Sequence, residues 1–434
     1  MGSTVTPAEW FDNLQTIMPA FKSFDTHPTI LESGMATSPP ASPSGVGAAG
    51  PPAPPQDYSA ARILPLAAGA FAMGTATFVT SGVLPEIAEG LGVGTGAAGQ
   101  AVTAYALAYA VLAPVLGALT GRMDRRSVLV GGLLLFTAGS AAGALAPSFG
   151  VLIASRAVAA AGAALYTPNA AVMASVLSPP RFQGRAMAVV LGGMTAATAL
   201  GVPLGTWLGT ALGWRAALWM VVLAALAALA GMALLPGGVR LPSAGLAERL
   251  RALGRPRLLA VTAQTLLVFW GSFTVFAYIV PVFAPVTGGG AVGAALLWVW
   301  GLASVAGNLA AGRASDARGP RTVMAVALPV LIALFLLVEP AAATLSGAFV
   351  WMLLYGAFGW LVAVPQQQRA VEVDPSSAPV LIGLNSSALY GGMSLGGITG
   401  GAALAWLEPA QLGYLGAALL VPALALLWTE RRRG

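Results

Sequence analysis

The sequence predicts an all-α membrane protein with twelve transmembrane helices in two pseudo-symmetric six-helix bundles. Three observations lead to this prediction. Of the 434 residues, 57% are hydrophobic and only 8% are charged, against roughly 25% charged in soluble domains, and the mean hydropathy is +0.81. From residue 63 onward, apolar segments long enough to cross about 30 Å of hydrocarbon follow one another. A glycine-led, Arg-rich turn that begins at Gly117 returns at Gly312, 195 positions later, which indicates two related halves.

The apolar segments set the expected spans and domains. We expect the spans at 63–84, 98–120, 128–146, 150–177, 187–211 and 214–235, then at 258–282, 289–311, 322–338, 342–364, 378–404 and 409–429. These bounds carry an uncertainty of about four residues. The predicted domains are a disordered N-terminal tail (1–60), a first six-helix bundle (61–236), a cytoplasmic linker (237–257) and a second six-helix bundle (258–430).

The tail and the linker are the polar parts of the chain. Residues 1–60 are rich in Pro, Ser, Gly and Ala and contain too little apolar surface to fold. They also lack the apolar core and cleavage site of a secretory signal. In the linker, residues 246–253 form an amphipathic pattern that predicts a short helix on the inner leaflet. A plain solvated linker is the alternative.

Arginine placement predicts the orientation in the membrane. With the N-terminus inside, every arginine except Arg156 and Arg215 falls in a cytoplasmic segment. The exterior loops then carry Glu86, Glu89, Glu339 and Glu408. The positive-inside rule therefore places both termini in the cytoplasm of a bacterium, with the chain in the plasma (inner) membrane. Topology also explains the net charge of +6, so we expect no nucleic-acid partner.

Several kinds of chemistry are excluded by composition. The chain has no cysteine and one histidine, His27 in the tail, so thiolate or clustered-His metal sites and catalytic triads are not expected. The run Gly288-Gly-Gly290 is not followed by Lys-Ser/Thr, which disfavours ATP-driven transport. We therefore expect no enzyme, no metal and no cofactor.

The repeated turn resembles that of the major facilitator superfamily, in which the second and third spans are joined by Gly-x-x-x-Asp-Arg-x-Gly-Arg-Arg. This copy departs from the pattern, with Gly121 in the place of Asp and Asp124 in the place of Gly. The resemblance implies a cytoplasmic gate in which the latch of the first half is lost or has moved to Asp124. The alternative is that the arginines only set topology. The implied gate residues are Gly117, Arg122, Asp124, Arg125, Arg126, Asp316 and Arg321.

The fifth span resembles the motif that distinguishes proton-driven antiporters within this superfamily. Its matching positions are Gly193, Gly201, Pro203 and Gly205. Small residues allow helices to approach closely, and proline removes a backbone donor and bends the helix. A bent, tightly packed helix is a plausible pivot and a barrier to proton leak, whereas generic helix packing is the alternative.

Two ionisable residues are candidates for proton coupling. Arg156 is the one permanent charge deep in a span, and it resembles the arginine of the family's fourth-span motif, although Ala159 replaces the usual Gln. Such a guanidinium faces a cavity or pairs with acceptors. Glu86 follows Pro85 at the end of a first span that resembles drug-exporting and sugar-exporting branches. Burial would raise the pKa of Glu86 toward a useful range, and an exposed loop carboxylate is the alternative.

A set of polar and aromatic residues in the predicted spans suggests a nearly uncharged central cavity. Such a cavity suits neutral amphipathic molecules. We expect about half of its members to face the cavity and the rest to be packing contacts. The members are Tyr105, Tyr109, Tyr166, Asn169, Gln264, Trp270, Tyr278, Asn385 and Tyr390, together with Asn308, Tyr355, Ser386 and Ser394.

The resemblance covers residues 62–430 and implies a 12-span drug:proton antiporter, similar to chloramphenicol-resistance and sugar-efflux exporters. Such a carrier exports a small amphipathic, antibiotic-like compound in exchange for protons by alternating access. A sugar or metabolite exporter of the same fold is one alternative. An uncoupled membrane binding or scaffold protein is another, because Gly121 and Ala159 depart from the motifs. The expected partners are a small-molecule substrate and the lipid bilayer, and a monomer is expected.

Overall fold

The computed structural model describes residues 60–179, 182–240, 255–374 and 378–431, all of which belong to one unit, Ala53–Gly434. The predicted tail up to residue 59 and the predicted amphipathic linker helix lie outside the described residues. Throughout the described ranges the regular structure is helical, and no residue there is in a strand.

The first half of the chain, up to residue 240, contains the helices of the first six predicted spans. They are α2 (Ala60–Gly82), α3 (Leu84–Leu91), α4 (Thr95–Ala98), α5 (Gln100–Leu119), α6 (Arg125–Ala144), α7 (Phe149–Val176), α8 (Gln183–Ala196), the π-helical segment η3 (Ala197–Gly201), α9 (Val202–Leu212), α10 (Trp214–Gly231) and η4 (Met232–Leu234).

The second half, from residue 255, contains the helices of the last six. They are α12 (Pro256–Phe276), α13 (Ile279–Thr287), α14 (Gly290–Arg318), α15 (Pro320–Leu336), α16 (Val338–Ala341), α17 (Leu345–Leu361), α18 (Ala363–Val373), α19 (Ala378–Ala403), η6 (Pro409–Gln411) and α20 (Leu412–Arg431).

Most of these helices are suited to a bilayer. In the described residues, 10 helical segments are long and apolar enough to cross a membrane. The ninth and eleventh predicted spans are helical as well, since α15 has 17 residues and α19 has 26. At about 1.5 Å per residue, even α15 spans roughly 25 Å. A helix therefore lies at each of the twelve predicted spans.

The two halves repeat a specific backbone break. The helix α2 is interrupted at Val83, with φ −116° and ψ 23°, before α3 begins. The helix α12 is interrupted at Tyr278, with φ −116° and ψ 22°, before α13 begins. These residues are 195 positions apart, the same offset as the repeated turn. The repeat seen in the sequence is therefore also a repeat of structure.

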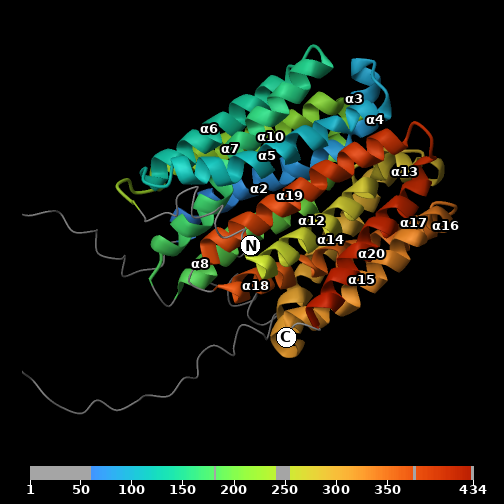
Figure 1. Cartoon of the computed structure of the whole chain (residues 1–434). Coiled ribbons are helices and arrows are strands. Elements are labelled where there is room, and N and C mark those ends of the chain that lie inside the picture. Colours follow the sequence, from blue (N-terminus) through green and yellow to red (C-terminus); the bar gives the residue numbers. More distant parts are fainter. Residues whose placement is uncertain (1–59, 180–181, 241–254, 375–377, 432–434) are drawn as a thin grey trace, which may run out of the picture. The chain divides into compact units, whose positions relative to one another are not determined.

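The helices of each half pack mainly on one another. In the first half α6 packs on α7 and α2 packs on α8 and α10, while in the second half α12 packs on α19 and α20, and α14 on α17. The halves meet where α5 lies beside α19 (Figure 1) and where α14 packs on η3 and α9. Substrate sites of carriers built from structural repeats lie between the repeats, so these contacts frame the candidate site.

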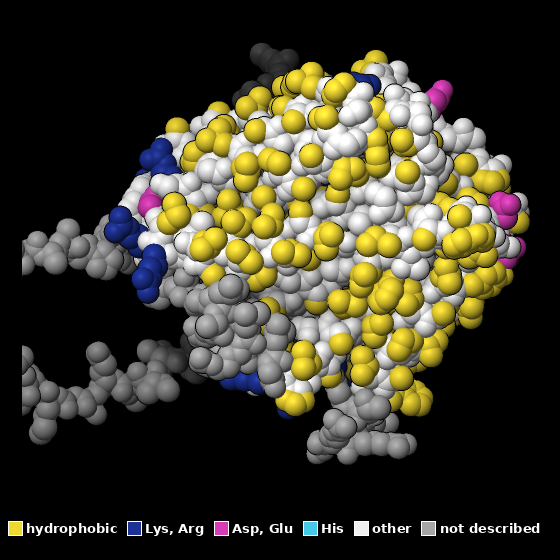
Figure 2. Space-filling model, turned by 45° about the horizontal axis from the view of Figure 1, so that its top comes forward, with side chains coloured by type: hydrophobic (Ala, Val, Ile, Leu, Met, Phe, Trp, Pro, Cys, Tyr) yellow, Lys and Arg dark blue, Asp and Glu magenta, His cyan; other side chains and the backbone are white. Residues whose placement is uncertain are grey.

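Most basic residues gather at one end of the helices and most acidic residues at the opposite end on the face that Figure 2 shows. We call the end that carries the α5–α6 turn and the end of α14 the basic end, and the opposite one the acidic end. From Ala110 to Thr120, the part of α5 toward the basic end, every residue is at least partly exposed. Six residues between Ala101 and Tyr109 are buried. The part of α5 toward the acidic end is thus packed more closely than its part toward the basic end.

Candidate functional site

Arg156 is buried within the first half, with 3% of its surface exposed. Its Nη2 donates to the Ala76 carbonyl of α2 at 2.8 Å, and its Nε donates to the Ala101 carbonyl of α5 at 3.3 Å. The guanidinium also lies over the Tyr105 ring, 4.4 Å from its centre. No Asp or Glu of the described residues pairs with it. The charge is therefore compensated by carbonyl dipoles and a π face, without a carboxylate.

Tyrosines extend this polar centre to the second half. Tyr109 of α5 and Tyr390 of α19 stack with ring centres 3.8 Å apart and planes inclined by 27°. Tyr105 lies one helical turn from Tyr109, and its buried hydroxyl has no hydrogen bond of good geometry. Arg156 and the three tyrosines, which we call the Arg–Tyr centre, are buried and connect α7, α5 and α19. Three of the predicted cavity residues therefore come together with the predicted central charge.

An aromatic pocket lies beside α2 at the height of Ala76, the residue to which Arg156 donates. Phe78, two residues beyond Ala76, extends into it and meets the rings of Trp300 and Trp360 at 5.7 and 5.9 Å. The space between its rings has room for about one water molecule. Its lining is Phe78, Phe269, Ser272, Phe273, Trp300, Tyr355, Gly359 and Trp360. Of these, only Tyr355 was among the residues predicted from the sequence.

Several other predicted cavity residues make helix-packing hydrogen bonds. The Tyr166 hydroxyl donates to the Leu66 carbonyl at 3.0 Å, and the Tyr278 hydroxyl donates to the Gly397 carbonyl at 2.8 Å. Trp270 Nε1 donates to the Thr399 hydroxyl at 2.8 Å. In each case the polar atom donates to an acceptor on a neighbouring helix. These side chains fasten helices together near the site.

Gln264 of α12 and Asn385 of α19 both make polar contacts that involve α12. Gln264 is fully buried, and its Nε2 donates to the Ala423 carbonyl at 2.7 Å while its Oε1 accepts from Arg369 Nη1. Asn385 Oδ1 accepts from the Thr265 hydroxyl at 2.7 Å. Arg369 is 5% exposed, although its position suggested only a role in topology. The run Gln366-Gln-Gln-Arg369 in a mostly apolar stretch was the signal that could have indicated this cluster.

At the basic end, Arg125 and Asn169 are joined. Arg125 Nη1 donates to Asn169 Oδ1 at 2.8 Å and Nη2 donates to the Gly121 carbonyl at 3.2 Å, while the Asn169 amide donates to the Leu165 carbonyl. Asn169 therefore belongs to the predicted gate region instead of the cavity. Asp124 caps its own helix, α6, by accepting from the Ser127 backbone N–H at 3.1 Å. The link between α6 and α7 is made by an arginine and an amide.

The remaining predicted gate residues are near the surface. Arg122 and Asp316 are exposed, and Gly117, Arg126 and Arg321 are partly exposed. Arg321 Nη2 donates to the Leu427 carbonyl of α20 at 2.7 Å. The structure thus ties Arg321 to the last helix and does not bring it to Arg125.

The predicted antiporter motif coincides with an irregular helix. The π-helical segment η3 interrupts α8 and α9, and Pro203 follows in the first turn of α9. A Cβ at Gly193 would lie 2.2 Å from the Ala67 carbonyl oxygen, and one at Gly201 would lie 2.0 Å from the Thr75 hydroxyl. Gly205 similarly approaches Val79, so the motif glycines allow α2 to lie against this span. π-helical turns are frequent at functional sites.

Glu86 lies in α3 at the acidic end and is partly buried. Its Oε2 is inaccessible to solvent and has no hydrogen-bond partner. Burial raises the pKa of the Glu86 carboxyl above its ordinary value, and Glu89 raises that pKa further by charge repulsion, while a backbone hydrogen bond lowers it. The structure does not bring Glu86 into hydrogen-bond or ion-pair contact with Arg156. The two predicted coupling residues therefore occupy separate places.

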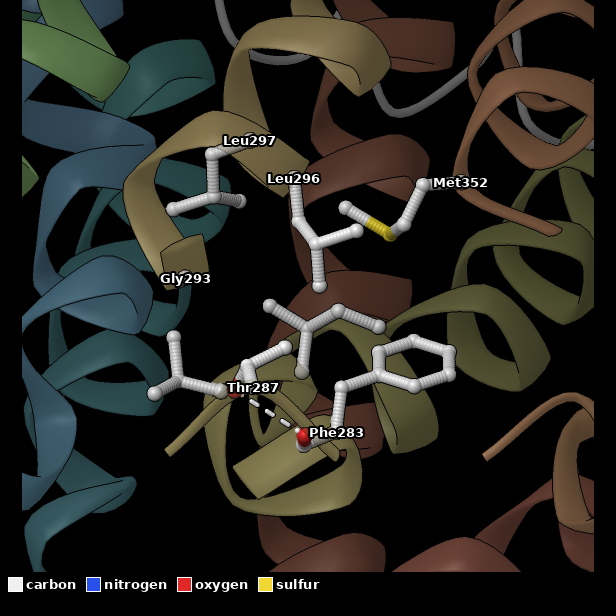
Figure 3. Close-up of a pocket in the computed structure, with 8 residues that line it drawn as sticks. Phe283, Thr287, Gly293, Leu296, Leu297 and Met352 are labelled. Carbon is white, nitrogen blue, oxygen red and sulfur yellow. Dashed lines mark hydrogen bonds between the residues drawn. The ribbon is translucent and has the colours of Figure 1, made fainter. Parts of the chain in front are cut away.

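A second, apolar hollow lies near the acidic end of the second half (Figure 3). Phe283 and Thr287 of α13, Gly293, Leu296 and Leu297 of α14, and Met352 of α17 surround it, and the Thr287 hydroxyl donates to the Phe283 carbonyl at 3.0 Å. No charged group lines it. It shares no residue with the Arg–Tyr centre.

Pseudo-symmetric helix bundles with a polar centre between them are the architecture of secondary membrane transporters. The family model of the Major Facilitator Superfamily matches residues 66–397. The chain belongs to this superfamily and is a multi-pass membrane transporter. The predicted fold class is therefore confirmed, and the family is one of transporters, not enzymes, which agrees with the expectation from composition.

Relatives make this membership more specific. The chain is 41% identical over 295 residues to the chloramphenicol resistance protein of Streptomyces lividans, covering 66% of this chain and 75% of that protein. It is 33% identical over 383 residues to the inner membrane transport protein YdhP of Escherichia coli, covering 86% and 96%. It also resembles the solved structure of a bacterial homolog of the human lysosomal transporter Spinster, inward-facing and unoccupied, with TM-score 0.67 at 18% identity, covering 87% and 98%.

Proposed function

We propose that this chain is an efflux transporter of the inner membrane that exports a small, antibiotic-like amphipathic compound in exchange for protons by alternating access. The observation that carries the proposal is the Arg–Tyr centre. A permanent charge is buried between α2, α5 and α7 without a carboxylate, beside tyrosines that reach the other half. Placing a guanidinium at bilayer depth is costly, and such charges mark substrate or ion pathways.

The relatives support export as the direction of transport. One relative is named for chloramphenicol resistance, and removing an antibiotic from the cytoplasm is one way in which a transporter confers resistance. The basic end would lie in the cytoplasm under the positive-inside rule, with both termini inside. In this arrangement the loosely packed basic end admits substrate from the cytoplasm, while the helices toward the acidic end are closed.

Glu86 is the proposed proton-accepting carboxylate. It is at the acidic end, which would face the exterior, and its buried Oε2 has no partner. A raised pKa lets the carboxyl bind a proton at a pH where an ordinary glutamate is ionised. Arg156 would then act on the substrate, because no titrating carboxylate of the described residues lies against it.

The test is the export of labelled chloramphenicol and labelled sugars from cells that carry this chain, with and without a protonophore. We expect protonophore-sensitive export that is lost in Arg156→Ala and reduced in Glu86→Gln. Export that survives the protonophore and both substitutions would show a facilitator or another coupling ion. Export of sugars alone would favour a sugar or metabolite exporter. Binding without transport or proton movement in liposomes would favour an uncoupled binding or scaffold protein.

A further inference from the structure

Tyr278 stands at the backbone break between α12 and α13, and its side chain reaches the first half of the chain. The side chain is fully buried, and its hydroxyl donates to the Gly397 carbonyl of α19 at 2.8 Å. The Gly96 carbonyl of α4, which belongs to the first half, lies 3.4 Å from the same hydroxyl. The tip of this tyrosine therefore lies where the two halves meet, toward the acidic end.

Glycines of both halves surround the Tyr278 hydroxyl, and we call Gly96, Gly99 and Gly401 the glycine socket. A Cβ at Gly99 would lie 2.2 Å from the hydroxyl oxygen, and one at Gly401 would lie 2.5 Å from it. A Cβ at Gly96 would lie 2.6 Å from the Gly401 carbonyl oxygen, so α4 and α19 approach each other closely. The phenol ring fits at this place because these three residues have no side chain.

A second donor crosses between the halves at the same carbonyl. Gln100 Nε2, at the start of α5, donates to the Gly397 carbonyl at 3.3 Å, and the Tyr278 hydroxyl donates to that carbonyl as well. A carbonyl oxygen has two lone pairs, so it can accept from both donors. Separation of the halves at this end would withdraw Gln100 from Gly397 and the first-half glycines from Tyr278.

The equivalent break in the first half makes no such connection. Val83 lies 195 positions before Tyr278 and has nearly the same φ and ψ, so the break itself does not require a tyrosine. Val83 packs within its own half, since a Cβ at Gly209 of α9 would lie 2.3 Å from Val83 Cγ1. The tyrosine at the second break therefore has a role beyond shaping the backbone.

We propose that Tyr278, seated in the glycine socket, is a latch that holds the two halves together at the acidic end and leaves the socket when this end opens. The proposal goes beyond the proposed export function, because it depends neither on the compound that is moved nor on protons. Loss of one hydrogen bond changes an equilibrium by about two- to tenfold. A methyl group forced into the socket changes it by about five- to 150-fold.

The test measures how fast a cysteine between the halves reacts from the side of the acidic end. The chain has no cysteine, so Ser394→Cys supplies a single thiol at a position that is 1% exposed. Ser394 lies on α19 between Tyr390 and Gly397, which both contact α5, so it faces the first half. A membrane-impermeant maleimide is added to sealed vesicles that contain the full-length chain. The reaction rate then follows the fraction of molecules whose acidic end is open.

A separate reporter shows which end of the chain faces the reagent. Ser148 is exposed between α6 and α7, at the acidic end. Ser148→Cys, made alone, therefore reacts readily only in vesicles whose outer side carries the acidic end, and these are the vesicles used.

Two variants change the latch independently, and each has a matched control. Tyr278→Phe removes the hydroxyl, and Gly99→Ala fills the socket. The Tyr166 hydroxyl donates to the Leu66 carbonyl at 3.0 Å, and a Cβ at Gly69 would lie 2.2 Å from that hydroxyl, all within the first half. Tyr166→Phe and Gly69→Ala thus make the same two changes away from the contact between the halves. Size-exclusion chromatography verifies that each variant is folded.

We expect the Ser394→Cys thiol to react about two- to tenfold faster with Tyr278→Phe and about five- to 150-fold faster with Gly99→Ala, and at an unchanged rate with either control. An unchanged rate in the folded latch variants overturns the latch. Equal acceleration by the controls also overturns it, because general loosening would then explain the result. If the Ser394→Cys thiol of the otherwise unaltered chain reacts as fast as that of Ser148→Cys, the acidic end is not held closed and the latch is refuted directly.

Discussion

One methyl group added at Gly301 tests whether the contact between α14 and η3 matters for transport. A Cβ at Gly301 would lie 2.1 Å from the Thr198 carbonyl oxygen, well inside the 3.4 Å at which ordinary contact begins. The obstacle is backbone of η3, so no side-chain rotation relieves it, and α14 must move away. Overpacking of this kind costs about 1–3 kcal/mol, equivalent to a fall of about five- to 150-fold in the population of this arrangement relative to others.

Gly301→Ala is therefore expected to slow export by about five- to 150-fold and to change the distances between the halves. The chain contains no cysteine, so spin labels at Met123→Cys and Ala317→Cys, both exposed at the basic end, report that distance without background. Gly293→Ala is the control, because a Cβ there has nothing within 4 Å and faces the hollow of Figure 3. If Gly301→Ala leaves the distances and export as in Gly293→Ala, the contact is not required.

Three further predictions concern charged and polar groups. Arg156→Lys keeps the charge but replaces the planar guanidinium, whose Nε and Nη2 donate to separate carbonyls, with a single nitrogen, so we expect export to fall at least about tenfold in cells. Export at the wild-type rate would contradict the proposed role. Glu86→Gln should stabilise the chain at neutral pH by less than about 1 kcal/mol, because the raised pKa makes the ionised carboxylate the destabilised form. The difference in stability between the wild-type chain and Glu86→Gln should disappear below the ordinary pKa of 4.5, where the carboxyl is protonated in both folded and unfolded chains. Melting temperatures of the two chains are measured between about pH 4 and pH 8. A difference that stays constant over this range would contradict the prediction. Asn169→Leu leaves Arg125 Nη1 without its acceptor and should cost about 1–3 kcal/mol of stability, whereas Asn169→Asp retains an acceptor oxygen; equal losses of stability in thermal unfolding would show that the bond does not matter.

The helices were predictable because each span is a long apolar segment, and a bilayer allows such a segment only a helix or a barrel. The backbone breaks were not predictable in the same way. Gly82 and Pro85 flank Val83, and Pro203 follows Ala197–Gly201, so the sequence indicates weak points in these helices, but hydropathy does not distinguish a π-helical turn from a regular one. Their geometry depends on packing against other helices, such as η3 on α14. The residue pattern of one segment contains little information about which other helices pack against it.

The candidate site was predictable where it contains a charge or tyrosine hydroxyls and not where it contains phenylalanine and tryptophan rings. Arg156 stands out because a guanidinium in an apolar span needs compensation. Trp300 does not, because Trp298, two residues earlier on α14, is 47% exposed while Trp300 is 2% exposed. Aromatic residues face lipid and interior alike. Polar residues such as Tyr166 and Gln264 were ambiguous for a related reason, since their hydrogen bonds to carbonyls of other helices satisfy them without a ligand.

The separation of Glu86 from Arg156 bears on how proton and substrate would be coupled in the proposed exchange. Glu86 is partly buried here, where the helices toward the acidic end are packed, and its ionised form is disfavoured by burial and by Glu89. Protonation removes this cost, so a proton bound at the acidic end favours the arrangement in which that end is closed. Ionisation favours exposure of the carboxylate and hence opening. A proton would therefore act on the equilibrium between the two arrangements, as a ligand that prefers one of them, and coupling requires no contact with the substrate at Arg156.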